Sequence, residues 1–560
     1  MSVFDVWSTF VSHVVGGTAG CVLASRLSED GSSTVLLIER GGVDDAWDSR
    51  VPLLSSNHFR KGCGSVRWPS EPLAEANNSS LTILEAEVLG GKSRINGMVY
   101  TRGSPADYNR WEELGNVGWA YDDVEPYFIK SETSLMHAKA PYRGHTGRSR
   151  DAAVKLGLPI IDDVNSPTAP PVGVSTMDIV LDRQMHREST YRTFLPLSLA
   201  LARKSSLKIC THATVTRVNI SDCAGDGLVA KGVYFESMKE AAPRETFYAS
   251  ARKEVVLCCG ALVSPQILML SGIGPKVHLE EHDISVVKDL PGVGSRLQDH
   301  LGVPVMYQVP PADSVHGLEL NPLRAIIEFL KYVLFGAGLF TASFLQLTVF
   351  AKSSFLNSNT EAVAHTAPQL NPNVPDNRPD IEVMPVASNC SDEVIPNTAI
   401  FSFLTSLLRP QSVGSVRLSS NDPYSHPRVQ LGYLTNPADY EPMRKALKLA
   451  LRLADHMRAA GYPLKNLKVP ASENEADLDN HVRWNLRTCY HFCGTCAMGP
   501  HQDSVRPGVV DAELRVHGVG GLRVCDASVF PEIIATHTMA PVVMVAEKCA
   551  ELLKAVGSVA

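Results

Sequence analysis

The sequence predicts two domains: an α/β domain with a parallel sheet, and an α+β domain with an antiparallel sheet. The N-terminal segment has the order strand, glycine turn, helix, strand and acidic residue. Later segments alternate between period-two apolar patterns and helical spacing. The 560-residue chain, with 44% hydrophobic and 20% charged residues, is also long enough to form two apolar cores.

The N-terminal elements predict a Rossmann-like domain that binds an adenine dinucleotide. Residues 10–15 form an apolar strand, and an amphipathic helix follows the turn made of Gly16, Gly17, Thr18, Ala19 and Gly20. A second apolar strand over residues 34–38 precedes Glu39, 19 positions after Gly20, close to the spacing of about 20 in this motif. Glycines let the backbone approach a pyrophosphate, and the helix N-terminus supplies N–H donors to it. The acidic residue can accept hydrogen bonds from the ribose hydroxyls.

The glycine turn departs from the G-x-G-x-x-G pattern, because Val15 occupies the position of the first glycine. The departure has two explanations: weakened cofactor binding, or a misplaced exon junction in a predicted sequence. Residues 1–13 are also atypical, which favours the second explanation.

Composition excludes several function classes. A formal net charge of -7 provides no basic face for nucleic acid. We expect no membrane span, since charged residues and glycines interrupt the most apolar stretch, residues 325–350, which we interpret as buried helix and loop. The N-terminus shows no secretory signal, so we expect a cytoplasmic protein, with secretion as the alternative if the N-terminus is incorrectly predicted.

Twelve cysteines are spread thinly along the chain, which favours reduced, buried thiols. Cys489, Cys493 and Cys496 form a C-x3-C-x2-C pattern that zinc or dithiol sites also show. No second cysteine pair follows at zinc-ribbon spacing, so we expect no metal site.

His491 and His537 are the candidate catalytic residues. Both lie in irregular segments that contain glycine, threonine or proline. A pair of imidazoles can remove a proton from a hydroxyl group and hold the resulting alkoxide, because the unperturbed histidine pKa lies near neutral pH. A single histidine in a large protein is more often structural, so this hypothesis depends on the other motifs.

Four further segments, in order along the chain, resemble motifs of the glucose-methanol-choline (GMC) oxidoreductases. Residues 89–103, beginning Leu-Gly-Gly-Lys-Ser-Arg-Ile-Asn-Gly, resemble the first family signature, and residues 260–274 resemble the second. Residues 291–300, ending Leu-Gln-Asp-His, are similar to the connector into the substrate domain. Residues 524–531 are similar to the last flavin-binding strand and turn. The chain is thereby identified as a member of this family.

The resemblance implies FAD as the cofactor. Ile95 occupies the position where some members carry a histidine bonded to the flavin, so we expect non-covalent FAD. Lys92 stands where the family usually has a small residue. Its side chain has two possible roles: contact with a cofactor phosphate, or exposure to solvent. The implied cofactor-binding residues are Gly16, Gly17, Thr18, Ala19, Gly20, Glu39, Gly91, Ser93, Asn96, Gly97, Met98, Val99, Val215, Asp526, Ala527 and Met539. The helix that begins after His537 is expected to direct its N-terminus at the flavin.

The resemblance also implies a discontinuous domain organisation. Residues 1–130, 208–301 and 486–560 would form the FAD-binding domain, and residues 131–207 and 302–485 the substrate-binding domain. Within the latter, residues 412–418 are typical of a strand, and residues 440–460 have helical spacing.

The function expected from these motifs is oxidation of an alcohol CH–OH group, with hydride transfer to flavin N5. His491 would be the base and His537 its hydrogen-bonding partner. The partners would be a small-molecule alcohol and an electron acceptor, oxygen or another, and the setting would be secondary metabolism. Two alternatives stay open: a non-redox family member, either lyase or cyclase, and a flavin-free pseudoenzyme.

Overall fold

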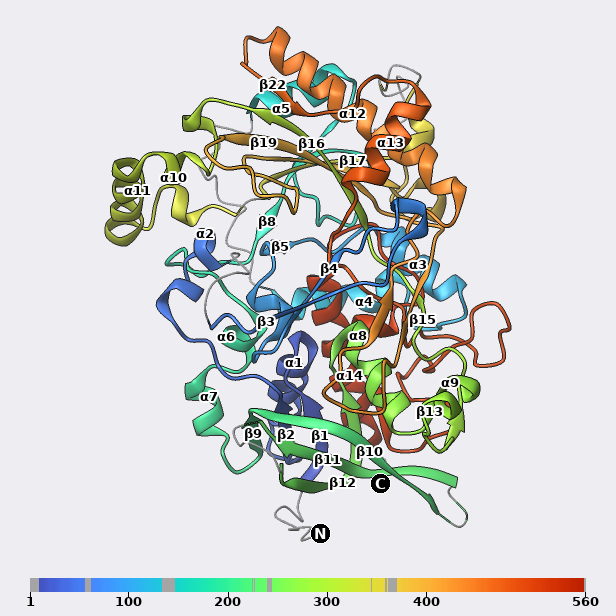
Figure 1. Cartoon of the computed structure of the whole chain (residues 1–560). Helices are drawn as coiled ribbons and strands as arrows, with labels where there is room; N and C mark the ends of the chain where they lie inside the picture. Colours follow the sequence, from blue (N-terminus) through green and yellow to red (C-terminus); the bar gives the residue numbers. More distant parts are fainter. Residues whose placement is uncertain are drawn as a thin grey trace.

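The structure is a computed structural model of the chain. It describes residues 10–55, 62–132, 147–223, 225, 227–238, 244–343, 345–357, 360 and 370–557. Two large sheets lie at opposite ends of the molecule, with the N-terminal sheet at the bottom of Figure 1 and the other at the top.

The first sheet has the strand order β10-β11-β12-β1-β2-β9, and β24 pairs with β12. Strands β12, β1, β2, β9 and β24 pair in parallel, whereas β10, β11 and β12 pair antiparallel. All five residues of β2 are buried, as expected for a parallel strand covered on both faces. The strands are β1 (Phe10–Val15), β2 (Val35–Glu39), β9 (Leu207–Thr211), β10 (Ala213–Cys223), β11 (Gly227–Ser237), β12 (Thr246–Leu257) and β24 (Leu522–Val524).

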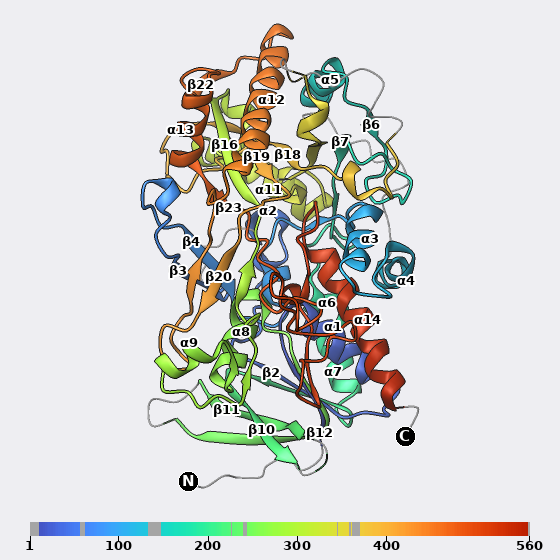
Figure 2. The same cartoon turned by 90° about the vertical axis from the view of Figure 1, so that its right-hand side faces the viewer.

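Helices α1 (Thr18–Leu27) and α14 (Met539–Gly557) pack against each other beside this sheet, as Figure 2 shows. Their contact includes a buried ion pair in which Arg26 Nε and Nη2 lie 2.8–2.9 Å from the carboxylate of Glu547, which is fully buried. Helix α8 (Gly260–Leu270) follows β12. The N-terminal ends of the three helices face the same part of the molecule and line the cavity described below.

The second sheet has the order β22-β16-β19-β18-β17-β7-β6, with β23 paired to β16. All pairs are antiparallel except β6 with β7. Helix α12 (Tyr440–Ala459) packs on β18 and β19, with α5 (Gly147–Lys155) and α13 (Glu475–Asn485) beside it. The strands are β6 (Ile160–Ile161), β7 (Gly173–Thr176), β16 (Leu301–Gln308), β17 (Leu347–Ala351), β18 (Ile381–Val386), β19 (Ile400–Leu407), β22 (Lys465–Lys468) and β23 (Arg487–Thr488).

The α/β plus α+β fold class is therefore confirmed. Strands of the two sheets alternate along the chain, and β23, within residues 486–560, belongs to the second sheet. The shorter strands are β3 (Ser65–Pro69), β4 (Thr82–Ala86), β5 (Val99–Tyr100), β8 (Asp178–Ile179), β13 (Ile273–Gly274), β14 (Lys288–Asp289), β15 (Ser295–Leu297), β20 (Gly414–Arg417) and β21 (Arg428–Gln430). The remaining α-helices are α2 (Pro52–Ser55), α3 (Pro105–Glu113), α4 (Tyr121–Ser131), α6 (Thr190–Phe194), α7 (Leu197–Ala202), α9 (Lys276–Glu281), α10 (Gly317–Leu320) and α11 (Pro322–Phe335).

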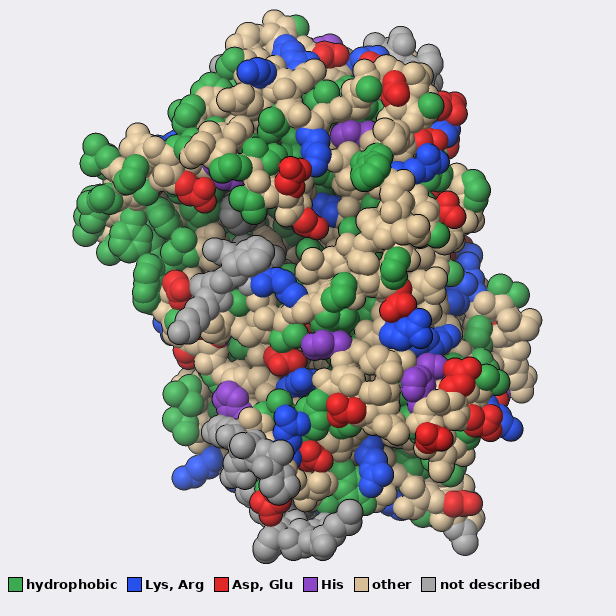
Figure 3. Space-filling view, in the orientation of Figure 1, with side chains coloured by type: hydrophobic (Ala, Val, Ile, Leu, Met, Phe, Trp, Pro, Cys, Tyr) green, Lys and Arg blue, Asp and Glu red, His purple; other side chains and the backbone are tan. Residues whose placement is uncertain are grey.

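Helix α11 corrects the interpretation of residues 325–350 as buried helix and loop. The following strand, β17, is fully buried, but α11 projects from the molecule and forms an apolar cluster at the left of Figure 3. Apolar content alone cannot show which side of a helix meets solvent, and here only Tyr332 is buried. The exposed apolar residues are Leu323, Ile326, Ile327, Leu330, Val333, Leu334 and Phe335.

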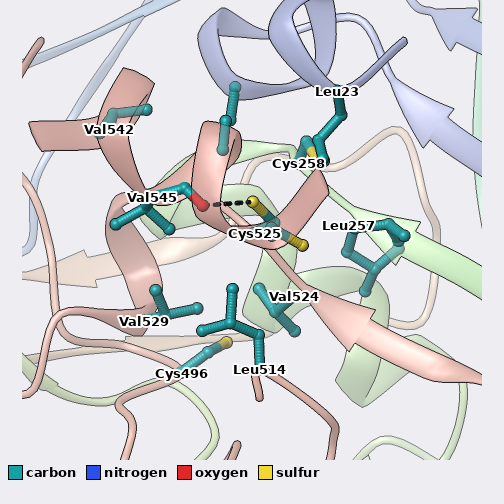
Figure 4. Close-up of a cluster of buried hydrophobic side chains, with 14 of the residues drawn as sticks. Leu23, Leu257, Cys258, Cys496, Leu514, Val524, Cys525, Val529, Val542 and Val545 are labelled. Atoms are coloured by element: carbon teal, nitrogen blue, oxygen red, sulfur yellow. Dashed lines mark hydrogen bonds between the residues drawn. The ribbon is translucent and has the colours of Figure 1, made fainter. Parts of the chain in front are cut away.

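The core of the first domain contains buried thiols, as the cysteine distribution predicted. Cys258, Cys496 and Cys525 lie among valines and leucines in Figure 4, and all three are free. Burial raises the pKa of Cys258 to about 11, which leaves it protonated at neutral pH. These cysteines therefore act as small apolar side chains. Within the described ranges, no helix combines the length and apolar character needed to cross a lipid bilayer.

Candidate active site

A cavity of about 540 Å³ extends from the end of β2 to the histidines and is bounded by both large sheets. Thirteen implied cofactor-binding residues line it, as do both candidate catalytic histidines. These lining residues are Gly17, Thr18, Ala19, Glu39, Gly91, Ser93, Asn96, Gly97, Val99, Val215, Asp526, Ala527, Met539, His491 and His537. Gly16, Gly20 and Met98 do not line the cavity, so a direct cofactor contact is not supported for these three.

The glycine turn brings three backbone segments into close contact. A Cβ atom at Gly17 would lie 2.7 Å from the carbonyl oxygen of Cys258, and one at Gly91 would lie 3.1 Å from Gly17 Cα. Helix α1 begins immediately afterwards, and the Thr18 hydroxyl donates to the Gly90 carbonyl over 3.1 Å. Open backbone N–H groups at such a helix start bind anions. The side chain of Val15, the unusual residue of this turn, lies outside the described part of the chain.

Glu39 ends β2 and is only 5% exposed. Burial raises the pKa of Glu39 to about 7, although the Gly41 backbone N–H donates to Oε1 over 2.9 Å. A buried carboxylate that lines a cavity and accepts from one backbone donor has remaining acceptor capacity. The two hydroxyls of an adenosine ribose would supply the matching donors.

Asn96 is oriented by an arginine that the sequence analysis did not identify. Arg187, which is 1% exposed, donates to Asn96 Oδ1 over 2.5 Å and to the Ser93 carbonyl over 2.9 Å. Asn96 Nδ2 in turn lies 3.0 Å from Met539 Sδ, at the start of α14. The network joins the first signature to the last helix.

The implied residue Asp526 and the unusual residue Lys92 are both paired within the protein. The Asp526 carboxylate accepts from the Gly260 backbone over 2.9 Å, from Ser264 Oγ over 2.6 Å and from the Ser528 backbone over 2.8 Å, so it holds the start of α8 beside the cavity. Lys92 Nζ lies 2.6 Å from Glu85 Oε1 and therefore forms an ion pair within the cavity wall.

Three histidines, rather than two, meet at the other end of the cavity. The His491 ring lies edge-to-face with the His537 ring, with centroids 4.9 Å apart, and also with the His300 ring, at 5.0 Å. The hydrogen bond of His491 goes to His300, with 2.9 Å between the two Nδ1 atoms. His300 ends the Leu-Gln-Asp-His motif, whose sequence indicates only a connector between the two domains.

The partners of His300 determine which ring nitrogens carry hydrogen. Its Nε2 lies 3.1 Å from the carbonyl oxygen of Ile534, which can only accept. Burial lowers the pKa of His300 to about 4, so the ring is neutral and Nδ1 is an acceptor. His491 Nδ1 must then donate, which leaves a lone pair on His491 Nε2. Burial and the nearby His537, His300 and Lys92 hold the pKa of His491 well below its usual value.

The backbone of His491 is fixed separately. Asp299 Oδ1 accepts from the His491 N–H over 2.6 Å, and Thr488 and Tyr433 donate to Oδ2. Burial raises the pKa of Asp299 to about 6. Asp299 and His300 are neighbours in one motif, so one connector segment holds both the backbone and the ring of His491.

His537 faces a carboxylate from the second sheet. Its Nε2 lies 3.5 Å from Oε1 of Glu382, which is 2% exposed on β18 and accepts from Thr348 Oγ1 over 2.6 Å. Burial alone would raise the pKa of Glu382, but the neighbouring His537 and the Thr348 hydrogen bond lower it below its usual value. At 3.5 Å the pair is beyond hydrogen-bond distance, so His537 Nε2 has no hydrogen-bond partner among the described residues.

The three cysteines near His491 are part of the packing. Burial raises the pKa of Cys489 to about 12 and that of Cys493 and Cys496 well above the usual thiol value. In the described ranges, no group of three histidine, cysteine or acidic side chains is arranged to hold a metal ion.

A dinucleotide-binding fold whose cavity ends at buried histidines is the arrangement expected of a class of enzymes, the oxidoreductases that use a dinucleotide cofactor. Two models of the GMC oxidoreductase family match this chain, one over residues 13–302 and the other over residues 410–546. The chain therefore belongs to the GMC oxidoreductase family, whose cofactor is FAD.

The relatives span nearly the whole chain. Oxygen-dependent choline dehydrogenase of Escherichia coli K12 is 33% identical over 561 residues, covering 96% of this chain and 94% of its own length. A solved FAD-dependent oxidoreductase from Chaetomium thermophilum has 26% identity and a TM-score of 0.81, covering 98% of this chain and all of its own. A fungal aryl-alcohol oxidase has 25% identity and the same TM-score, covering 98% and 99%.

FAD fits the residues that line this cavity. Glu39 offers a buried acceptor for ribose, and the N-terminal ends of α1 and α14 direct positive dipole ends at the cavity. Glycine at position 17 leaves room for the turn to approach Cys258. Ile95 also lines the cavity and has no nucleophilic atom for a covalent link.

We predict that FAD affinity falls as the pH decreases from 8 to 6. The ionised Glu39 would accept from the ribose hydroxyls of FAD. Because its pKa in the free protein is about 7, Glu39 would have to lose a proton for FAD to bind below pH 7. The loss should approach tenfold per pH unit. Fluorescence titration of apoprotein with FAD measures it. Glu39→Gln should bind FAD more weakly and independently of pH in this range; a variant that kept the pH dependence would contradict the assignment.

Proposed function

We propose that this protein oxidises the CH–OH group of a small-molecule alcohol, with His491 as the base. The observation that carries the proposal is the chain of hydrogen bonds from Ile534 through His300 to His491, which leaves the His491 Nε2 lone pair free in the cavity wall. A neutral imidazole with a free lone pair can accept a hydroxyl proton.

The two other histidines support this proton transfer in different ways. His300 accepts from His491 Nδ1 and so orients the ring. His537 Nε2, which has no hydrogen-bond partner among the described residues, can contact the substrate oxygen. Glu382 lies 3.5 Å from this nitrogen and would stabilise His537 if it is protonated. His537 is therefore proposed as the partner of His491 through the substrate rather than by a direct hydrogen bond.

When bound, FAD would supply the redox chemistry, with flavin N5 as the hydride acceptor. The chain's own contribution is to hold FAD without a covalent bond. Glu39 would bind the adenosine, the α1 N-terminus the pyrophosphate, and Asn96 and Met539 would lie near the flavin end of the cavity. The N-terminal end of α14 would stabilise negative charge there.

Anaerobic addition of candidate alcohols to the purified flavoprotein tests the proposal. Bleaching of the flavin absorbance by at least one alcohol is expected. Bound FAD that no alcohol in a broad aliphatic and aromatic panel bleaches would favour a non-redox family member, a lyase or cyclase. A colourless protein that does not bind added FAD would be a pseudoenzyme.

The electron acceptor and the setting belong to the same proposal. Mixing the bleached protein with oxygen separates an oxidase, which recovers its colour quickly, from a dehydrogenase, which needs another acceptor. The proposed setting, secondary metabolism, rests on the resemblance to fungal family members. A gene that lies beside polyketide or peptide synthases would support it.

A further inference from the structure

A second cavity lies outside the proposed active site. It has a volume of about 430 Å³ and is formed by α3, the 3-10 helix Pro375–Asn377, β15 and the loop that follows β19. Figure 1 shows α3 and β15 on the right-hand side of the molecule, below the second sheet. Five arginines line this cavity: Arg110, Arg296, Arg378, Arg409 and Arg506.

The carboxylates in the cavity wall do not balance these arginines. Only Glu113, Asp376 and Glu532 line it, and Glu532 is shared: Arg378 Nη1 lies 3.0 Å from its carboxylate, and Arg110 and Arg506 each lie 3.6 Å away. Behind the wall, Asp107 lies 3.6 Å from Arg378. The five arginines and three carboxylates that line the cavity thus carry an excess of two positive charges. When Asp107 is counted with them, the excess is one positive charge.

Two of the arginines form no ion pair with a described carboxylate. Neither Arg296 nor Arg409 has a carboxylate within 4.0 Å in the part of the chain that the structure describes. Burial lowers the pKa of Arg409, and the neighbouring Arg378 lowers it further; burial and Arg506 do the same to the pKa of Arg296. More distant carboxylates, Glu532 for both arginines, Asp503 for Arg296 and Asp107 and Asp380 for Arg409, offset this effect only in part, because the pKa of each arginine stays below its usual value.

Donor atoms in the cavity wall are also unsatisfied. Arg409 Nε and Arg506 Nη1 are buried and have no hydrogen-bond partner among the described residues. Arg296 is held in the left-handed backbone region, with φ of 57°, which residues with a Cβ rarely adopt. Buried donors without partners call for a bound group that accepts from them.

From this geometry we infer that the arginine cavity binds a small, multiply charged oxyanion, such as a phosphate or a dicarboxylate. The guanidinium groups of Arg296, Arg409 and Arg506 would donate hydrogen bonds to the oxygens of this anion. The N–H groups of a guanidinium are spaced to bind two oxygens of a planar carboxylate or of a tetrahedral phosphate. Glu532 and Arg378 form the buried base of the site. The cavity volume is suited to a small molecule.

The arginine cavity lies next to the connector, residues 291–300, which contains His300. Gln298 lines the arginine cavity, and its Oε1 accepts from the Ile533 N–H over 3.0 Å. Ile534, the next residue, is the one whose carbonyl accepts from His300. Anion binding is measurable without turnover, so its test does not depend on the proposed oxidation.

Isothermal titration calorimetry of the holoprotein with inorganic phosphate and with malonate, at constant ionic strength, tests the inference. Saturable binding of at least one anion at one site per chain is expected. Arg409→Gln and Arg296→Gln should each weaken that binding about tenfold or more, because each removes charged hydrogen bonds to the anion. Two variants are used so that poor folding of Arg409→Gln would not prevent the test.

The matched control is Arg515→Gln, which removes one arginine from a surface position that is 53% exposed and paired with Asp511. It should bind the anion like the unchanged protein. Whether phosphate or malonate binds more tightly identifies the class of anion. The inference is overturned if neither anion saturates, if chloride gives the same heat at equal ionic strength, or if Arg296→Gln and a folded Arg409→Gln bind as tightly as Arg515→Gln.

Discussion

His491→Ala is expected to slow reduction of the bound flavin by alcohol between about 10²-fold and 10⁴-fold, the usual contribution of a positioned base. The variant removes the Nε2 lone pair that the hydrogen bond to His300 leaves free. FAD binding should change little, because the other wall residues remain. Anaerobic stopped-flow absorbance with an alcohol that bleaches the unchanged protein measures the rate.

The control for this variant is His501→Ala, which removes an exposed histidine away from the cavity. Its reduction rate should equal that of the unchanged protein. An unaltered rate in His491→Ala would show that His491 is not the base.

The pH profile gives a second measurement of the same base. His491 must be neutral to accept a proton, and its pKa is held well below the usual value by burial and by the neighbouring His537, His300 and Lys92. The reduction rate should therefore stay level as the pH falls from 8 to about 6.5, the ordinary histidine pKa, and decrease only below it. A decrease that begins above 6.5 would contradict this charge state.

Gly17→Ala is expected to weaken FAD binding between about 5-fold and 150-fold. The added methyl group would lie 2.7 Å from the carbonyl oxygen of Cys258, a backbone atom that cannot rotate away, so the turn must shift. Overpacking of this kind costs about 1–3 kcal/mol, which corresponds to that loss in affinity. Titration of apoprotein with FAD, followed by flavin fluorescence, measures the change.

Gly520→Ala is the matched control, since a Cβ there meets only ordinary contacts at 3.6 Å and the position lies on the surface. It should bind FAD normally. If Gly17→Ala also bound normally, the turn would not approach the cofactor closely. Such a result would support the explanation that this turn, with Val15 in place of glycine, no longer holds the pyrophosphate.

Local elements were predictable because their signals lie within short windows. Residues 10–15 form β1 as expected, a helix follows the glycine turn, and β2 runs up to Glu39. The helix predicted over residues 440–460 is α12, and the strand predicted within residues 412–418 is β20. Helical and strand periodicity are set by neighbours a few positions apart, so they can be read without knowledge of the fold.

The sequence by itself determined the fold class, the family and the two candidate histidines, because these follow from local patterns and motif order. Tertiary structure decided that the hydrogen bond of His491 goes to His300, 191 positions away, and that Glu382 faces His537. It also decided that α11 exposes its apolar residues and that five arginines share one cavity. Such contacts form where separate segments are packed together, and the pKa of each group depends on that burial and on those neighbours.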